Sequence, residues 1–585
     1  MPKPAGPPAF GRLLLLAAVA VLYLWGLGDR GFQDPDEGMY AEIAREMATS
    51  GDWVVPRFNG VPYVEKPPLV YWLTAGSFLL LGPSEFAARL WKVLPILGTL
   101  ALTMVLGGRL ISPRAALPAG LILATGLGTY LFSRISQMDP MHAFGVTLAA
   151  AGIAQAGPRA GRAAGYAFWT GTALAVLSKG LPGLFFPAAL AAGRTLTHGG
   201  AALRGLRAWR PILLAGALVL PWHVAVAARV PGFVGFYLWD NQVLRFLGRR
   251  AYAEDGTGLA TWAFLAVTAF CLLPWLPYLG AAAWRRQARG ERERNRLFLL
   301  SWVAAVLGLF ALSSFKLEYY ALPAFPAVAL LVAGLLDQAA WPASPSEGAA
   351  TRRQLRAWTW VGILGGLVFT GAAAWLWAGQ RLTPEALVQA LALWSTNYRV
   401  ILDQGLALPG VSPGFFAGIA VGGGAAWVAA FTLVLVAINQ GRIREAALLV
   451  GATGLLLCVL GASVLRAVEP HHSLKPLARH LAAAARPEDR IVHERGLEKG
   501  GGLVFYLGRP VLVLNGTRGD LEFGSRLPGT QGMFLDAARF AELWRGPGRV
   551  FVVTDLPLAR SAVGAAEPRP VLLASTPTRW LYANR

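Results

Sequence analysis

A long succession of apolar runs is the feature that most restricts how this chain can fold. A helix needs about 20 apolar residues to cross a bilayer, and by this measure the sequence predicts about thirteen spans. They lie near residues 10–27, 89–111, 115–133, 141–156, 163–178, 180–198, 211–228, 259–282, 297–314, 319–336, 358–378, 413–438 and 446–465. Only 15% of the 585 residues are charged. This excludes an ordinary soluble protein and predicts a polytopic α-helical membrane domain over residues 1–465.

Basic residues mark one side of the predicted membrane domain. Arginines gather in every second connection between spans, at 109 and 114; 159 and 162; 204, 207 and 210; 285, 286, 289, 292, 294 and 296; 352, 353 and 356; and 442 and 444. Positively charged loops stay on the cytoplasmic side, so we expect the N-terminus inside and the region after the last span outside. The net charge of +21 therefore reports topology and does not indicate nucleic-acid binding.

The first outer loop, residues 28–88, is unusually acidic at its start. Residues 33–47 read QDPDEGMYAEIAREM, where Asp36 is suited to cap a helix and the following residues form an amphipathic, interfacial helix. The apolar stretch 67–82 is short and begins with proline, which favours a re-entrant or interfacial segment. If it crossed the membrane fully, the topology after it would invert.

Charged residues from six distant parts of the chain fall on this predicted outer face. They are the acidic stretch with Asp34, Asp36, Glu37 and Tyr40; Glu65 with Lys66; Asp139; Lys179; Asp240 with Arg245; and Lys316 with Tyr320. Charges at membrane boundaries are costly unless they are solvated or paired. Their convergence predicts one functional site, although Lys179 could instead snorkel from a span end and Asp139 could only cap a helix.

Two further outer regions complete the layout. Residues 229–258 carry several aromatic residues before Asp240, which suits an outer loop over the site. Residues 466–585 are less apolar and predict a small outside α/β domain, with strands at 490–493, 503–507, 510–514 and 549–554 and a helix at 532–544. The two cysteines, Cys271 and Cys458, lie far apart in apolar segments and indicate neither a disulfide nor a metal cluster.

Some polar residues are weaker candidates. Arg249 and Arg250 are expected to be surface charges, and the adjacent pair His471 and His472 is only a weak metal signal. Glu65 offers a ligand for a divalent metal ion, so a metal cofactor stays open and no definite cofactor is predicted.

An ordered set of motifs resembles the bacterial lipid A aminoarabinose transferases (ArnT-like) and the wider protein O-mannosyltransferase-like membrane glycosyltransferases of the GT-C superfamily. The motifs are Pro35-Asp36-Glu37, Tyr40-Ala41-Glu42-Ile43, Arg45-Glu46-Met47, Ser50-Gly51-Asp52-Trp53, Val55-Pro56, Glu65-Lys66-Pro67, Asp139-Pro140, Lys179-Gly180, Leu220-Pro221-Trp222, Arg245-Phe246, Pro274-Trp275, Lys316-Leu317 and Tyr320. Met39 and Glu318 depart from the aminoarabinose pattern at the expected site, which puts the sugar and the acceptor in question more than the reaction.

The resemblance implies inverting transfer of a sugar from a polyprenyl-phosphate carrier to lipid A, another glycolipid, a polysaccharide or a protein. It implies a bacterial inner-membrane protein whose site and C-terminal domain face the periplasm. Under this reading Asp36 is the catalytic carboxylate, with Asp139 and Glu37 beside it. Substrate-binding residues would be Tyr40, Glu65, Lys66, Lys179, Asp240, Arg245, Lys316 and Tyr320.

Other functions remain to be weighed against a transferase. A transporter or flippase of lipid-linked sugars would place ionisable residues near the membrane midplane and often shows repeated halves, and the sequence displays neither. A membrane scaffold that binds partners through residues 466–585 is a further alternative.

Overall fold

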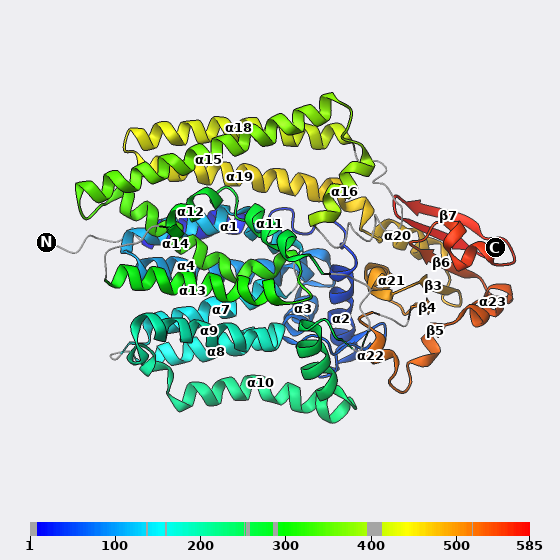
Figure 1. Ribbon diagram of the computed structural model, residues 1–585. Coiled ribbons are helices and arrows are strands. Elements are labelled where there is room, and N and C mark those ends of the chain that lie inside the picture. The colour runs from blue at the N-terminus through cyan, green and yellow to red at the C-terminus, as the bar shows by residue number, and fades with distance from the viewer. Residues whose placement is uncertain are drawn as a thin grey trace.

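The computed structural model describes residues 9–135, 138–157, 161–250, 252, 258–284, 290–394, 412–516 and 519–585. A bundle of long helices forms one part of the molecule, and a smaller α/β domain sits at one end of the bundle (Figure 1). We call this end the domain end. Arg159, Arg285, Arg286 and Arg289, and residues 251 and 253–257 of the expected outer loop, lie outside the described residues.

Every predicted span falls on a helix or on a bent pair of helices. These are α1 (Ala9–Leu24), α4 (Glu85–Leu110), α5 (Ala116–Thr125) with α6 (Leu127–Ile135), α7 (Asp139–Gln155), α8 (Arg162–Lys179), α9 (Leu181–His198), α10 (Trp209–Arg229), α11 (Thr261–Cys271) with α12 (Leu276–Trp284), α13 (Glu291–Leu312), α14 (Phe325–Ala340), α15 (Pro345–Ala378), α18 (Pro413–Asn439) and α19 (Ile443–Val468). Among the described residues, seven helices are long and apolar enough to cross a membrane, or nine with the bent pairs. The other four predicted spans match α1, α7, α8 and α9, helices of 16 to 18 residues within the same bundle (Figure 1).

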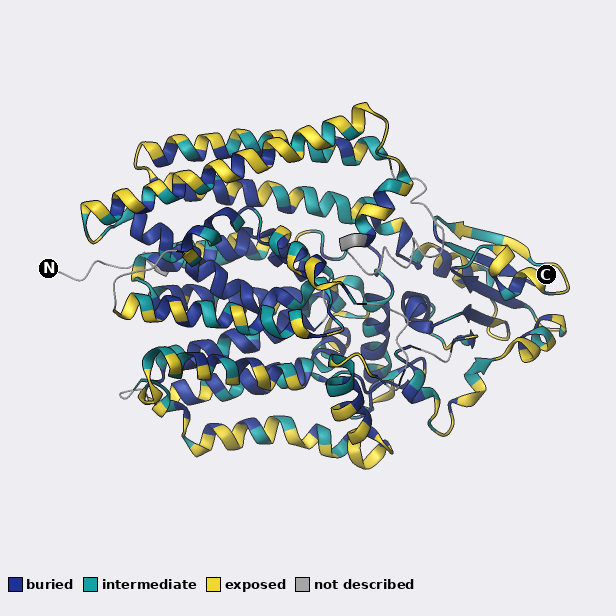
Figure 2. Cartoon of the chain, in the orientation of Figure 1, coloured by how far each residue is buried: buried dark blue, intermediate teal, exposed yellow. Residues whose placement is uncertain are grey.

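The pattern of exposure is that of a membrane bundle. Helix α14 runs through the centre with nearly all of its side chains buried. Helices α10, α15 and α18 lie at the periphery, where exposed positions predominate (Figure 2). The exposed side chains there are apolar, such as Leu213, Val224, Leu364 and Val368. A surface of this composition is suited to lipid and not to water.

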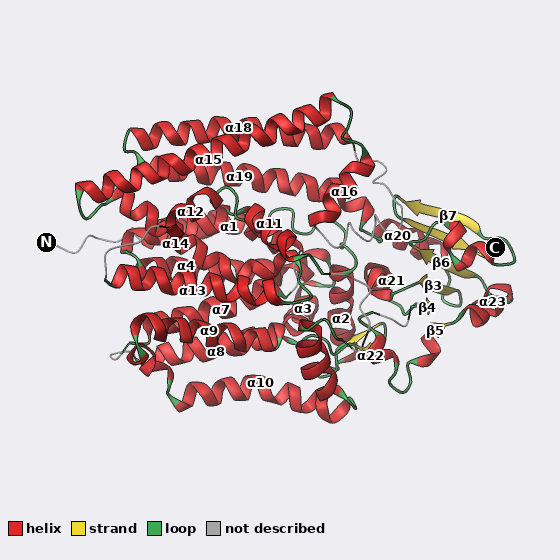
Figure 3. Cartoon of the chain, in the orientation of Figure 1, coloured by secondary structure: helices red, strands yellow, loops and turns green. Residues whose placement is uncertain are grey.

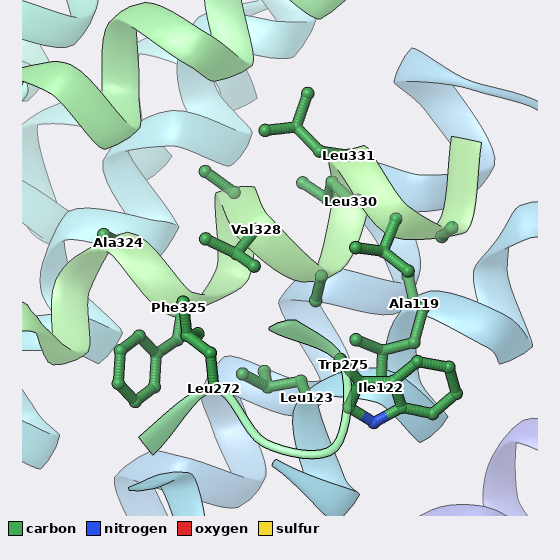
Figure 4. Close-up of a cluster of buried hydrophobic side chains, with 14 of the residues drawn as sticks. Ala119, Ile122, Leu123, Leu272, Trp275, Ala324, Phe325, Val328, Leu330 and Leu331 are labelled. Carbon is green, nitrogen blue, oxygen red and sulfur yellow. The ribbon is translucent and has the colours of Figure 1, made fainter. Parts of the chain in front are cut away.

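The two bent pairs support each other at the centre of the bundle. The α5–α6 pair is bent by 55° and the α11–α12 pair by 104°. A helix break leaves backbone groups without intrahelical partners. Here the Leu127 N–H donates to the Leu273 carbonyl at 2.9 Å, and the Trp275 indole donates to Thr125 Oγ1 at 2.9 Å. Figure 4 shows Trp275 among the apolar side chains that enclose this junction.

The first long connection stays at the domain end. It contains α2 (Asp36–Ser50), a two-stranded hairpin of β1 (Arg57–Phe58) and β2 (Val61–Pro62), and α3 (Leu69–Leu81). Helix α2 lies across the direction of the long helices (Figure 1). Helix α3 has 13 residues, which is short for a span of about 20 residues and agrees with the interfacial alternative. The expected cap is wrong in detail, because Pro35 is the N-cap and Asp36 is the first helical residue.

The C-terminal domain is built on a six-stranded sheet (Figure 3). Its elements are α20 (Lys475–Ala484), β3 (Arg490–Glu494), α21 (Gly501–Leu507), β4 (Leu512–Leu514), α22 (Glu522–Ser525), β5 (Phe534–Leu535), α23 (Ala537–Arg545), β6 (Val550–Thr554), β7 (Val571–Thr576) and β8 (Arg579–Ala583). The strand order is β5-β4-β3-β6-β8-β7, parallel from β5 to β6, with β8 antiparallel to both of its neighbours.

Three expected strands of this domain are confirmed and one is wrong. Residues 503–507 form part of helix α21, because a buried apolar run of five residues fits a helix as well as a strand. The expected helix 532–544 begins only at Ala537, where the Asp536 side chain accepts from the Arg539 N–H and caps it. Strands β5, β7 and β8 were not expected, and β5 (Phe534–Leu535) lies where the helix was predicted.

Helix α21 joins the domain to α2 by close backbone contact. A Cβ on Gly38 would lie 2.0 Å from the Gly502 nitrogen, and a Cβ on Gly501 would lie 2.2 Å from the Met39 nitrogen. Asp34 Oδ1 accepts from the Gly502 N–H at 2.8 Å. Because α21 follows β3, the carboxyl edge of the parallel strands is directed toward α2 and the predicted site.

Candidate functional site

Asp36 stands at the start of α2 with few fixed partners. The Tyr319 hydroxyl approaches Asp36 Oδ2 at 3.5 Å, the limit of a hydrogen bond. Burial raises the pKa of Asp36, while the nearby Lys66 and Lys92 cations oppose this rise. A carboxylate that is loosely held and has a raised pKa is suited to accept a proton.

Glu37, the next residue, is held on all sides. Its carboxylate accepts from Arg89 at 2.8 and 3.0 Å, from Lys92, and from the Gln33 N–H at 2.9 Å. Although burial opposes the effect, Arg89 and Lys92 hold the pKa of Glu37 far below its ordinary range. Arg89 also donates to the carbonyls of residues 27, 30 and 31. Glu37 therefore ties the first connection to α4 and is not available as a base.

Asp139 and Lys179 form a second group. Asp139 begins α7 and Lys179 ends α8, and their side chains are joined by an ion pair. The Lys179 ammonium lies 3.6 Å from the centroid of the Tyr320 ring and 5.8 Å from that of Tyr319. Its side chain is only 12% exposed, so it does not snorkel to the surface. Tyr319 thereby links this pair to Asp36.

Arg250 organises a third group. It is paired with Glu65 and, at 3.1 Å, with Asp240 on a π-helical stretch (Gly235–Leu244). The Asn241 side chain donates to the Glu65 carbonyl at 2.6 Å. The expectation that Arg250 is a surface charge is wrong, because its side chain is 7% exposed. Arg249 is exposed, as expected.

Two cations border these carboxylates. Lys66 lies 3.9 Å from Glu65, and Arg245 donates to Asn241 at 3.3 Å and lies over the Phe315 ring. Burial and then Arg245 lower the pKa of Lys66 to about 8, against the effect of Glu65. Cations that repel each other in a partly buried place favour an anionic ligand between or beside them.

Two predicted residues stand differently. Lys316 is buried, and its ammonium donates to the Ser313 carbonyl, three residues away in the sequence, at 2.7 Å. Tyr40 belongs to an aromatic group, with ring centroids 6.3 Å from Tyr63 and 5.7 Å from Tyr71.

Several residues of this region were missed by the sequence reasoning. They are Arg89, Lys92, Arg250 and Tyr319. Arg89 and Lys92 lie at the start of the predicted span 89–111, and two cations within a span signal buried partners. The partner of Arg250 depends on tertiary structure, and its sequence position carries no such signal.

The described residues around Glu65 do not form a donor set that fits a metal ion. Within the described ranges, no group of three or more His, Cys, Asp or Glu residues is arranged to hold one. Glu65 and Asp240 both pair with Arg250, so its guanidinium occupies the cationic position between them.

Comparisons with known proteins agree with this architecture. A family model described as dolichyl-phosphate-mannose-protein mannosyltransferase matches residues 9–237. An undecaprenyl phosphate-alpha-4-amino-4-deoxy-L-arabinose arabinosyl transferase of Edwardsiella ictaluri is 28% identical over 570 residues, 94% of each chain. A protein of the same name from Pseudomonas aeruginosa is 32% identical over 339 residues, 56% of this chain and 59% of the relative.

The fold is that of two solved structures. The crystal structure of ArnT from Cupriavidus metallidurans bound to undecaprenyl phosphate matches with a TM-score of 0.77 and 23% identity, over 99% of both chains. The apo form matches with a TM-score of 0.75 and 24% identity, again over 99% of both chains. The match therefore includes the membrane bundle and the C-terminal domain together.

Proposed function

We propose that the chain, which is similar to undecaprenyl phosphate-alpha-4-amino-4-deoxy-L-arabinose arabinosyl transferases and, over residues 9–237, to dolichyl-phosphate-mannose-protein mannosyltransferases, is a membrane glycosyltransferase. It moves a sugar from a polyprenyl-phosphate carrier to an acceptor on the outer face of the cytoplasmic membrane. The observation that carries this proposal is the placement of a loosely held carboxylate, Asp36, beside the cation Lys66 at the domain end. Transfer from a lipid phosphate to a hydroxyl acceptor needs both groups, a base for the acceptor and a cation for the leaving group.

The location of the site follows from the distribution of charge along the bundle. Arg114 and Arg204 belong to the connections α4–α5 and α9–α10, and Arg353 lies near the start of α15. These parts of the bundle are at the end opposite the C-terminal domain (Figure 1). Under the positive-inside rule that end faces the cytoplasm. We therefore place the site and the C-terminal domain in the periplasm of a bacterium, at the inner membrane.

Each group has a role in a single displacement. The acceptor hydroxyl oxygen attacks the anomeric carbon from the face opposite the phosphate, and its proton passes to Asp36. The bond from the anomeric carbon to the phosphate oxygen breaks, and the electron pair leaves with the polyprenyl phosphate. Lys66 and Arg245 stabilise the charge that develops there. The product has inverted configuration. If the acceptor is itself a phosphate, Asp36 orients it and takes no proton.

The Asp139–Lys179 pair supports the same site from the other side. Tyr319 contacts Asp36 and lies near Lys179, so the pair holds the aromatic wall beside the base. Lys316 donates to the nearby Ser313 carbonyl and is given no direct role in the reaction. Because Arg250 already joins Glu65 to Asp240, no step is routed through a metal ion.

The acceptor belongs to one of four classes: lipid A, another glycolipid, an envelope polysaccharide or a protein. The named relatives are undecaprenyl phosphate-alpha-4-amino-4-deoxy-L-arabinose arabinosyl transferases, and Met39 and Glu318 are the positions where this chain departs from the aminoarabinose pattern. Mass spectrometry of envelope lipids, glycans and proteins from cells with and without the gene identifies the acceptor.

A reconstituted assay tests the reaction itself. Purified protein in nanodiscs with undecaprenyl phosphate–4-amino-4-deoxy-L-arabinose or undecaprenyl phosphate–mannose, and lipid A, should release undecaprenyl phosphate. Asp36→Asn should abolish release. Asp29→Asn is the matched control, because Asp29 lies in the same connection but is 62% exposed. Flipping of the carrier without release by the wild type would instead indicate a transporter.

A further inference from the structure

A pocket lies between helices at the end of the bundle opposite the domain end. Its walls belong to α4, α12, α13 and α14, and its empty volume is about 520 Å³, part of which is open to the surrounding medium. Leu110, the last residue of α4, is a wall residue, so the pocket lies beside the α4–α5 connection that carries Arg114. Under the positive-inside rule this is the cytoplasmic end. The described wall residues include no member of the proposed reaction site.

Gln338 on α14 gives this pocket an unpartnered acceptor. Its side chain is buried in the wall, and its Oε1 atom accepts no hydrogen bond from any residue that the structure describes. Two other polar wall residues have partners: Asn295 donates to the Leu110 carbonyl at 2.8 Å, and Asp337 Oδ1 accepts from Ser112 at 2.8 Å. A buried acceptor without a donor is costly. A ligand that brings a donor into the pocket would remove this cost.

The surroundings of the pocket are positively charged. Arg292 is an exposed wall residue. Arg114 and Arg444 both lie on the ring of Trp341, the residue that follows α14, with guanidinium carbons 4.8 and 4.5 Å from the ring centroid. Within the described ranges, none of these three arginines forms an ion pair, and Asp337 is the one carboxylate of the wall. The excess of cations favours an anionic ligand, and the guanidinium group is especially suited to phosphate.

The two features together indicate a ligand with a phosphate and a hydrogen-bond donor. Much of the wall is apolar, with Leu299, Leu330 and Leu335 among its residues, so a lipid can pack against it. Basic pockets between transmembrane helices on the cytoplasmic side bind the headgroups of anionic phospholipids. Phosphatidylglycerol supplies a phosphodiester for the arginines and glycerol hydroxyls as donors. Phosphatidylethanolamine also has a phosphate and a donor, but its net charge of zero does not match the excess of cations.

We propose that this pocket binds the headgroup of phosphatidylglycerol from the cytoplasmic leaflet, with the phosphate beside Arg292 and a glycerol hydroxyl donating to Gln338 Oε1. The inference goes beyond the proposed transferase function and does not depend on it. A lipid held there would stabilise the packing of α4 against α13 and α14 at the end of the bundle that lies away from the reaction site.

The test compares lipids that differ in one property of the headgroup. Phosphatidylmethanol has the charge of phosphatidylglycerol but no headgroup hydroxyl, and phosphatidylethanolamine has a donor but no net charge. Each lipid is titrated into purified full-length protein in detergent, and native mass spectrometry measures the bound fraction. The wild type should bind phosphatidylglycerol between about twofold and tenfold more tightly than phosphatidylmethanol, as expected for one hydrogen bond. It should bind phosphatidylethanolamine more weakly than phosphatidylglycerol.

Variants assign the two contacts separately. Gln338→Leu should bind phosphatidylglycerol and phosphatidylmethanol equally. Because it replaces an unpartnered acceptor by an apolar group, its unfolding temperature without lipid should equal or exceed that of the wild type. Arg292→Gln should weaken binding of both anionic lipids by about fivefold, as expected for one arginine at an anionic lipid surface. Arg353→Gln removes an exposed arginine on α15 outside the pocket and is the matched control, which should keep the wild-type affinities.

Several results would overturn the inference. One is a wild type with equal affinity for phosphatidylglycerol and phosphatidylmethanol, or with higher affinity for phosphatidylethanolamine. Another is an unchanged affinity for phosphatidylglycerol in both Gln338→Leu and Arg292→Gln. A Gln338→Leu protein that unfolds at lower temperature than the wild type without lipid would show that the amide has a structural role. Sugar transfer is not part of the readout, so these results leave the proposed function to its own assay.

Discussion

Asp36 and Glu37 are neighbours in the chain, yet their surroundings are opposite. Glu37 accepts from Arg89, Lys92 and a backbone N–H, and it is almost completely buried. Asp36 is half-buried and has one long contact to Tyr319. A saturated carboxylate is fixed and keeps its charge, whereas an unsaturated one can take a proton or a ligand. Under the proposed function, Glu37 therefore has a structural role and Asp36 a chemical one.

The position of each residue on α2 explains the difference. Glu37 points toward α4, which supplies both of its cations from within one turn, at Arg89 and Lys92. Asp36 lies near Lys66 as well as Lys92, and its Oδ2 meets the hydroxyl of Tyr319 on the η4 turn (Glu318–Ala324). One helix therefore anchors the first connection with one carboxylate and presents the next to the site.

The largest effect should come from Asp36→Asn. The change removes the proton acceptor but keeps the shape, so transfer to a hydroxyl acceptor should fall by roughly 10²–10⁴-fold. The thermal unfolding temperature should stay near that of the wild type. Release of undecaprenyl phosphate in single turnover, together with the melting curve, checks both statements. Full activity of this variant would show that Asp36, like Glu37, is not the proton acceptor.

Glu37→Gln should act in the opposite way. Removing one partner of a buried ion pair leaves Arg89 and Lys92 uncompensated and should cost about 3–5 kcal/mol of stability. The fraction of protein that folds should decrease before the rate per folded molecule does. Thermal unfolding in detergent, with turnover normalised to folded protein, measures the two quantities separately. A stable but inactive Glu37→Gln protein would show that Glu37 belongs to the chemistry after all.

A third substitution pair extends the contrast to the outer connection. Arg250→Ala leaves Glu65 and Asp240 without their shared partner and should lower the free energy of unfolding by about 1.5–3 kcal/mol. Donor binding should also weaken, because Arg250 no longer holds Glu65 in place beside Lys66. Arg249→Ala removes an exposed charge and should change stability by less than about 0.5 kcal/mol. Unfolding curves compare the stability of the two variants, and titrations with the donor compare their affinity for it. Equal behaviour would mean that the ion pairs of Arg250 carry little weight.

The sequence was most informative where local pattern determines structure. The spans could be predicted because apolar length alone identifies a membrane helix, as α4 and α13 illustrate. The alternation of basic loops then predicted that Asp36, Asp139 and Lys179 lie at the same end of the bundle. No local pattern, however, says which carboxylate a cation will meet.

The remaining features depend on tertiary packing. Arg250 meets Glu65 across 185 positions of sequence, and Asp34 meets Gly502 across 468. Residues 503–507 belong to a helix that approaches α2 closely, and glycines at 38, 501 and 502 leave room for this approach. Such contacts are absent from composition and periodicity.

The pH dependence of transfer offers a finer test of Asp36. A base is active when deprotonated, so kcat/KM should rise with pH as Asp36 loses its proton. Burial raises the pKa of Asp36 and Lys66 opposes that rise, so Lys66→Met should move the rising limb to higher pH. Arg249→Met, which alters an exposed cation, should leave the limb in place. If kcat/KM of Lys66→Met rises at the same pH as that of the wild type, Lys66 does not influence the pKa of Asp36.

The smallest expected effect concerns metal removal. Glu65 and Asp240 are the carboxylates best placed to share a cation, and Arg250 fills that position with two ion pairs of its own. Because a divalent ion would have to displace a buried guanidinium, treatment with EDTA should change the rate of sugar transfer by less than about twofold, well below the loss expected when one catalytic group is removed. The same treatment of Arg250→Ala is the informative comparison, since Glu65 and Asp240 are then open to a cation and added Mg²⁺ or Zn²⁺ should restore part of the lost stability. Strong inhibition of the wild type by EDTA, reversed by one of these ions, would show that a metal ion displaces Arg250 and binds Glu65 and Asp240.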